Sequence, residues 1–135
     1  MKHKGFTLVE ILIVVIILGI LAAVVVPQFT DASSDAKVSA LSTDLQTVRS
    51  QLQLYKLQHG NSYPADIVKG LTTSTKVDGT AGGSFGPYLT TFPSNPFTNS
   101  SDVDINGTKG DGSHAWYYNS STGEFSPDDA AHSSM

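Results

Sequence analysis

The sequence predicts an α+β protein in which one long N-terminal helix packs on a small head with a short antiparallel β-sheet. Two observations support this class. An apolar run near the N-terminus passes into a helical repeat of apolar residues, and the repeat continues almost to Gly60. The remaining residues, 60–135, are rich in Ser, Thr, Gly, Asn and Asp, and they end in two short aromatic segments typical of strands.

Composition excludes several classes of function. The chain has 12 acidic and 8 basic residues, and Arg49 is its single arginine, so clustered cations for nucleic-acid binding are missing. Without cysteines it has no disulfide, thiolate metal site or cysteine nucleophile. The four histidines are scattered, without the spacing of a zinc motif, and no catalytic motif occurs. We therefore expect a protein that is not an enzyme.

Residues 6–26 are long and apolar enough to span a bilayer, which takes about 20 residues, and Glu10 is their only ionisable side chain. Lys2 and Lys4 flank the N-terminal end, so the positive-inside rule places the N-terminus in the cytoplasm and the head outside. A signal peptide is the alternative. The run ends in Ala22-Ala23-Val24-Val25-Val26-Pro27, a poor match to its cleavage site.

The start of the chain resembles the N-terminal signature of type IV pilins and of type II secretion pseudopilins. The resemblance rests on Lys4-Gly5-Phe6-Thr7-Leu8-Val9-Glu10 and extends to Pro27-Gln28-Phe29. It implies that a prepilin peptidase cuts after Gly5 and methylates the new amine of Phe6. It also implies that Glu10 pairs with the N-terminal amine of a neighbouring subunit. The expected segments are a leader (1–5), a transmembrane and filament-core helix (6–29), an amphipathic helix (30–59) and a loop-rich head (60–135) with short β-hairpins.

The chemistry of Glu10 agrees with the role that the resemblance implies. An ionised carboxylate near hydrocarbon is costly unless it is paired. Cleavage after Gly5 would create a positive amine on Phe6, and side-by-side helices with an axial offset would bring the two charges together. The alternative is a carboxylate that is merely solvated among lipid headgroups, and the resemblance favours the pair.

Two residues interrupt the stem, Gly19 and Pro27, and we expect Pro27 to kink or locally melt the helix. Beyond it an apolar stripe recurs at spacings of three and four, which predicts the face that packs on the head. Its members are Val38, Leu41, Leu45, Val48, Leu52 and Tyr55. Residues 79–84 are interpreted as a plain flexible linker. Residues 86–97 resemble the Gly-Pro-Tyr-Leu element of major pseudopilins, with Asn95 and Phe97 at positions where aspartate and tryptophan are common.

Residues 102–107 fit two structures. Asp102, Asp104 and Asn106 before Gly107 are the first half of a calcium loop, to which Asp111 could add a carboxylate. The loop is not a complete EF-hand, and Asp128 and Asp129 are competing ligands. The alternative is a type I′ hairpin turn at Asn106-Gly107. Major pseudopilins carry calcium in a C-terminal loop that this sequence does not clearly reproduce.

The last elements are a strand over residues 114–119, a turn, a returning strand that Pro127 ends, and a loose tail from Asp128. The sequence as a whole predicts a structural subunit that polymerises with itself, most consistent with a type II secretion pseudopilin. A type IV pilus subunit is the alternative, and a membrane-anchored module that never polymerises is the third. Expected partners are the peptidase, an inner-membrane assembly platform and lipid before assembly. Expected locations are the bacterial inner membrane and then a periplasmic or extracellular filament.

Overall fold

The computed structural model describes residues 5–135, so the predicted leader lies outside the described residues except for Gly5. The chain forms two compact units, which divide after Ala36 and which we describe separately. Helix α1 (Leu8–Gln58) runs through both. The other elements are helix α2 (Ile67–Thr72) and strands β1 (Val103–Ile105), β2 (Trp116–Tyr118) and β3 (Phe125–Pro127). The α+β class is confirmed.

Within the N-terminal unit α1 is unbroken at Gly19 and Pro27, so the prediction of local melting is wrong for the single chain. Pro27 lacks only its own N–H, and the flanking residues keep helical geometry. A kink in the axis stays a prediction. Every side chain from residue 5 to residue 40 is exposed, which leaves the apolar surface of this segment uncovered in the single chain.

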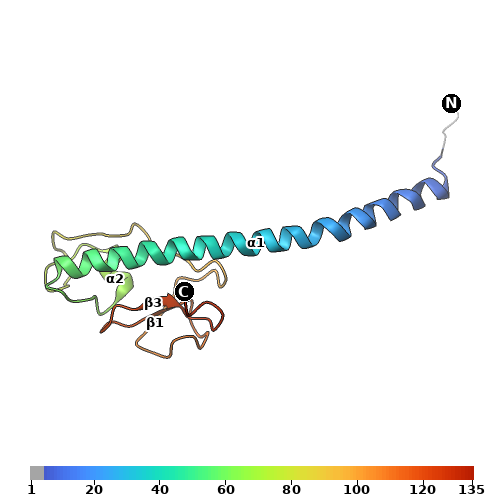
Figure 1. Cartoon of the computed structure of the whole chain (residues 1–135). Coiled ribbons are helices and arrows are strands. Elements are labelled where there is room, and N and C mark those ends of the chain that lie inside the picture. The colour runs from blue at the N-terminus through green and yellow to red at the C-terminus, as the bar shows by residue number, and fades with distance from the viewer. Residues whose placement is uncertain (1–4) are drawn as a thin grey trace. The chain divides into compact units, whose positions relative to one another are not determined.

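The core of the second unit forms where one face of α1 meets the sheet and α2, and Figure 1 shows these elements gathered along the C-terminal part of α1. Five members of the predicted apolar stripe are buried, whereas Val38 is exposed. The core residues that α1 packs against include Ile67, Leu71, Trp116, Tyr118 and Phe125. Aromatic residues of the 86–97 segment (Tyr88, Phe92 and Phe97) lie partly buried at its edge.

Helix α1 ends with a glycine cap. Gly60 adopts a φ of 62°, a left-handed conformation that costs glycine little, and the N–H of Asn61 donates to the carbonyl of Lys56 at 2.9 Å. His59, at this end of the helix, is buried and stacks on Tyr55 with ring centroids 3.7 Å apart. One ring nitrogen contacts the Tyr55 carbonyl and the other the Thr75 hydroxyl, at 2.8 and 2.9 Å.

The sheet is mixed, whereas the sequence predicted an antiparallel one. The strand order is β1-β2-β3, with β2 and β3 antiparallel but β1 and β2 parallel. The predicted hairpin at Asn106-Gly107 is therefore wrong. A type I′ turn needs positive φ at both residues, and only Asn106 has it, at 62°. The chain instead makes a long excursion between β1 and β2.

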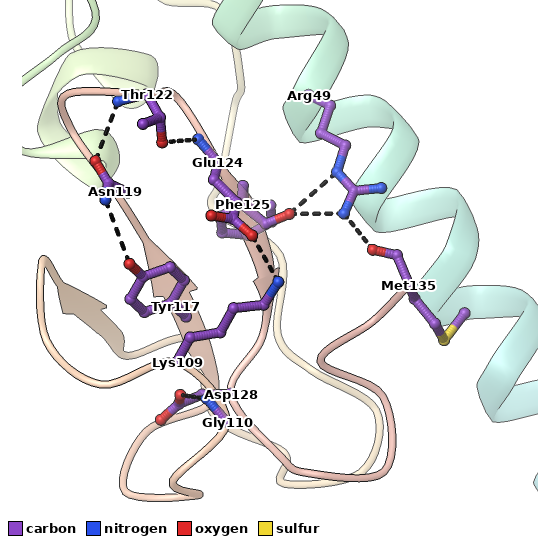
Figure 2. A network of polar contacts seen from close by, with 10 residues as sticks. All are labelled: Arg49, Lys109, Gly110, Tyr117, Asn119, Thr122, Glu124, Phe125, Asp128 and Met135. Atoms are coloured by element: carbon purple, nitrogen blue, oxygen red, sulfur yellow. Dashed lines mark hydrogen bonds and ion pairs between the residues drawn. The ribbon is translucent and has the colours of Figure 1, made fainter.

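Two segments expected to be loose are ordered by specific bonds. The linker at 79–84 is part of a bridged loop, because Thr75 and Phe85 exchange backbone hydrogen bonds of 2.8 and 3.1 Å across it. The tail is held by Arg49, which donates to the carbonyls of Phe125 and Met135 (Figure 2). Both expectations rested on the composition of the segment, and composition does not reveal hydrogen bonds to distant parts of the chain.

The apolar face of α1 should account for much of the stability of the head. We expect Leu52→Ala to lower the free energy of unfolding by about 2–5 kcal/mol, because it leaves a cavity in a packed core. The control is Leu57→Ala on the same helix, where the side chain is 81% exposed and the expected change is within about 0.5 kcal/mol. Denaturant unfolding of the detergent-dispersed chain, followed by emission of the buried Trp116, measures both. Equal losses would contradict the assignment of the core.

Candidate functional site

The N-terminus of α1 is closed by a reciprocal pair of hydrogen bonds between Thr7 and Glu10. The Thr7 hydroxyl oxygen accepts from the Glu10 backbone N–H at 3.2 Å, and the Glu10 carboxylate accepts from the Thr7 backbone N–H at 2.8 Å. This is a capping box, in which two backbone donors of the first turn are satisfied. The Thr7 hydroxyl also donates to the same carboxylate oxygen at 2.8 Å.

The capping box fixes the position of Glu10 through only one of its two carboxylate oxygens. All three bonds involve Oε2 or the Thr7 hydroxyl, which leaves Oε1 without a protein partner among the described residues. Beside it is a shallow groove lined by Phe6, Glu10, Ile11, Ile13 and Val14. The only carboxylate of this apolar segment is therefore held in place, and within residues 5–135 one of its oxygens has no partner.

The surroundings of Glu10 have the composition of a membrane helix. Among the described residues, 5–135, one helix is long and apolar enough to cross a membrane, namely α1. No residue of its most apolar 18-residue window is buried within the chain. Gly5 sits just before the helix, and a Cβ added there would meet no atom within 4 Å. Packing thus places no demand for glycine at this position.

The four residues predicted to bind calcium are not brought together. Asp102 accepts hydrogen bonds from the Ser100 hydroxyl, which lowers its pKa, and from the Ala115 backbone N–H. The side-chain oxygen of Asn106 accepts from the Ser120 N–H at 2.9 Å, which ties β1 to the turn after β2. Asp102 and Asn106 are thus hydrogen bonded to different segments of the head, and Asp102 and Asp111 lie outside the group of potential ligands that contains Asp104. Calcium itself stays a prediction.

Of the other two predicted ligands, Asp104 belongs to a different group. Asp104 comes together with His114 and Asp128, and one ligand atom from each lies within 4.8 Å of the others. Asp111 lies beside this group. Hydrogen bonds from Ser113 lower the pKa of Asp111, with smaller contributions from Asp128 and His114. Asp129, the other competing ligand, is hydrogen bonded to His132 at 2.7 Å.

A polar network holds the C-terminal strand against α1 (Figure 2). The Arg49 guanidinium donates to the Phe125 carbonyl through Nε and Nη2 at 3.0 and 2.8 Å, and through Nη2 to the Met135 carbonyl at 2.5 Å. Lys109 and Glu124 form an ion pair of 2.5 Å across the head. The single arginine thus donates to backbone carbonyls at both ends of the C-terminal segment.

Neither the capping box nor the group of Asp104, His114 and Asp128 was identified from the sequence, for different reasons. The Thr7-x-x-Glu10 spacing is a capping-box signature that could have been recognised. The group of Asp104, His114 and Asp128 spans 25 residues of chain, and its members come together only because β2 pairs with both β1 and β3. No local spacing signals such a group.

Comparison with known proteins gives matches over most of the chain. Residues 1–26 match a family model described as the prokaryotic N-terminal methylation motif, and residues 28–117 match one described as type II secretion system protein G. No solved structure gives a significant match.

Named relatives come from two kinds of system. Type II secretion system core protein G of Pseudomonas aeruginosa is 45% identical over 64 residues, which are 47% of this chain and 44% of that protein. The protein of the same name from Vibrio cholerae is 32% identical over 111 residues, 81% of this chain and 75% of that protein. A fimbrial protein of Neisseria meningitidis serogroup B is 38% identical over 77 residues, 57% of this chain and 45% of that protein.

The chain spans about half the length of several of the relatives that it matches, including the Pseudomonas and Neisseria proteins. The secretion model, however, covers more than half of the chain, and it includes much of the head as well as most of the amphipathic part of α1. Together with the long N-terminal helix and the small mixed sheet, this match shows that the chain belongs to the type II secretion system protein G family.

Proposed function

We propose that this chain is a pseudopilin, a structural subunit that polymerises through its N-terminal helix into the short filament of a type II secretion system. The observation that carries the proposal is the match of residues 28–117 to the protein G model, because the N-terminal motif alone is shared with pilins. The role is structural, and the apolar segment that holds the subunit in the inner membrane later forms the filament core.

Maturation is the first step of the proposal. A prepilin peptidase cuts after Gly5 on the cytoplasmic side and methylates the amine of Phe6. The match of residues 1–26 to the methylation motif supports this step. The open space around Gly5 also supports it. Packing does not require a glycine at this position, which is consistent with a glycine that the peptidase recognises. An inner-membrane assembly platform then receives the mature subunit, with its head in the periplasm.

Assembly is the second step, and it uses the open oxygen of Glu10. In lipid, a carboxylate with an unused oxygen has a strong preference for a cationic partner. The Phe6 amine of a neighbouring copy supplies one. Thr7 contributes by holding the carboxylate at the helix N-terminus, so that it is already oriented when the next subunit arrives. The exposed apolar side chains of residues 11–26 then pack against those of other copies.

A type IV pilus subunit is the second candidate, because the Neisseria fimbrial protein is 38% identical over its matched residues. Both candidates share maturation and stem packing, so they differ in the process that the filament serves.

Mass spectrometry of the mature N-terminal peptide tests maturation. We expect the peptide to begin at Phe6 and to be heavier than the unmodified peptide by one methyl group. In the variant Gly5→Val the leader should remain attached, while the head stays folded because the added side chain has open space. An N-terminus beyond Ala23 would instead identify a signal peptide and contradict the proposed stem.

Substitutions at Glu10 separate the ion pair from the capping box. Glu10→Gln keeps an acceptor suited to a capping box but removes the charge. We therefore expect it to abolish filament assembly nearly as fully as Glu10→Ala, with normal amounts of subunit in the membrane. Thr7→Val, which removes the hydroxyl and keeps the charge, should reduce assembly only partly. Assembly is measured as filaments recovered from lysed cells and counted by electron microscopy. Normal filaments from Glu10→Ala would contradict the proposed role of Glu10 in assembly.

Deletion of the gene separates the two candidate systems. Loss of exported proteins from the medium, with surface pili retained, is expected for a pseudopilin. Loss of pili with normal export would favour the pilus subunit. Expression of the wild-type chain from a plasmid should restore the lost process, and expression of Glu10→Gln should not.

A further inference from the structure

One end of the sheet gathers metal-ligating side chains from three segments. Asp104 lies in β1, His114 precedes β2 and Asp128 follows β3. One ligand atom from each lies within 4.8 Å of the others. The group shares no residue with the stem, so its chemistry does not depend on which filament the chain builds.

Asp128 is held in one orientation before any ion arrives. It is fully buried, and its two carboxylate oxygens accept hydrogen bonds from the backbone N–H groups of Gly110 and His114, at 2.9 and 3.1 Å. A carboxylate has about four acceptor positions, so each oxygen keeps a free lone pair. Supporting hydrogen bonds of this kind orient carboxylates that bind metals.

Asp104 is held by a close approach to Gly107. A Cβ added to Gly107 would overlap the Asp104 carboxylate, so this carboxylate occupies space that only a glycine leaves open. The φ of Gly107 is not in the left-handed region, so the turn itself does not demand a glycine here. The glycine is instead needed for the position of the carboxylate.

His114 has a hydrogen-bond partner that would leave its other ring nitrogen free to bind a metal. The His114 Nδ1 lies 2.8 Å from the Ser113 hydroxyl oxygen. When Nδ1–H donates to that oxygen, Nε2 keeps the lone pair that a metal needs, and a hydrogen bond of this type orients most metal-binding histidines.

The charges of the group are not balanced by the protein. Two carboxylates, Asp104 and Asp128, lie together with one histidine, and the exposed Asp111 lies near Asp128. Among residues 5–135 no lysine or arginine forms an ion pair with any of them, and the nearby Lys109 pairs with Glu124. A buried carboxylate among like charges is costly unless a cation compensates it.

We propose that Asp104, His114 and Asp128 bind one divalent transition-metal ion of the zinc class. An imidazole ligand beside two carboxylates suits zinc and similar ions, whereas calcium prefers oxygen ligands and takes more of them than this group offers. The bound ion links the segment after β3 to β1 and to the loop before β2. It would thus fasten the C-terminal part of the head to the sheet.

Titration of the detergent-dispersed full chain with zinc chloride, after treatment with a chelator, tests this proposal. Equilibrium dialysis should show one tightly bound zinc per chain. The near-ultraviolet signal of Trp116, two residues from His114, should report a rise in melting temperature of roughly 5 °C or more. Calcium chloride at the same concentration should give a smaller rise.

Matched variants identify the ligands. His114→Gln keeps the backbone bond to Asp128 but should weaken zinc binding at least tenfold, whereas His132→Gln, at a histidine outside the group, should leave it unchanged. Gly107→Ala should also weaken binding, because it displaces the Asp104 carboxylate and removes no ligand. The proposal is overturned if calcium binds more tightly than zinc, if neither ion raises the melting temperature, or if His114→Gln binds zinc normally.

Discussion

The head depends on the packing of one face of α1 against the sheet. Leu45, Val48 and Leu52 are buried on that face, and Trp116 and Phe125 lie among the residues that they pack with. Small heads with short strands have few other sources of stability, because three strands of three residues bury little surface by themselves. The Arg49 bonds to the last strand and tail reinforce the same contact between helix and sheet.

The first half of the same helix has the opposite property, since none of its apolar side chains is covered in the single chain. Such a surface is stable only in lipid or against other copies of itself. In the proposed assembly, Glu10 distinguishes the two environments, because its carboxylate lacks a cation in lipid and gains one from a neighbouring Phe6 amine in the filament. In the single chain the same carboxylate stabilises the helix through the capping box with Thr7.

Local patterns in the sequence predicted the parts of the structure that depend on local physics. The apolar run, the stripe from Leu41 to Tyr55 and the strand around Trp116 all have periodicities or residue types that suffice to identify them. The parallel pairing of β1 with β2 was not predictable in this way, because it joins segments that are separated by ten residues without a local turn signal that sets the strand direction. The order of the tail depends on Arg49, 86 residues away. The metal-ligating group depends on that same pairing, so its members could not be chosen from the spacing of Asp102, Asp104 and Asn106.

The central claim is that Glu10 of one copy contacts the Phe6 amine of another, and solid-state NMR of assembled filaments tests it directly. The chain has only two glutamates, Glu10 and Glu124, so carbon-13 on the glutamate side-chain carboxyl gives a simple spectrum. Filaments would be built from equal amounts of copies with nitrogen-15 phenylalanine and copies with carbon-13 glutamate. We predict a dipolar contact, at a separation of about 4 Å, between the amine nitrogen and the Glu10 carboxyl carbon. Since the labels are on different copies, only contacts between subunits give this signal. Well-formed filaments without it would contradict the account.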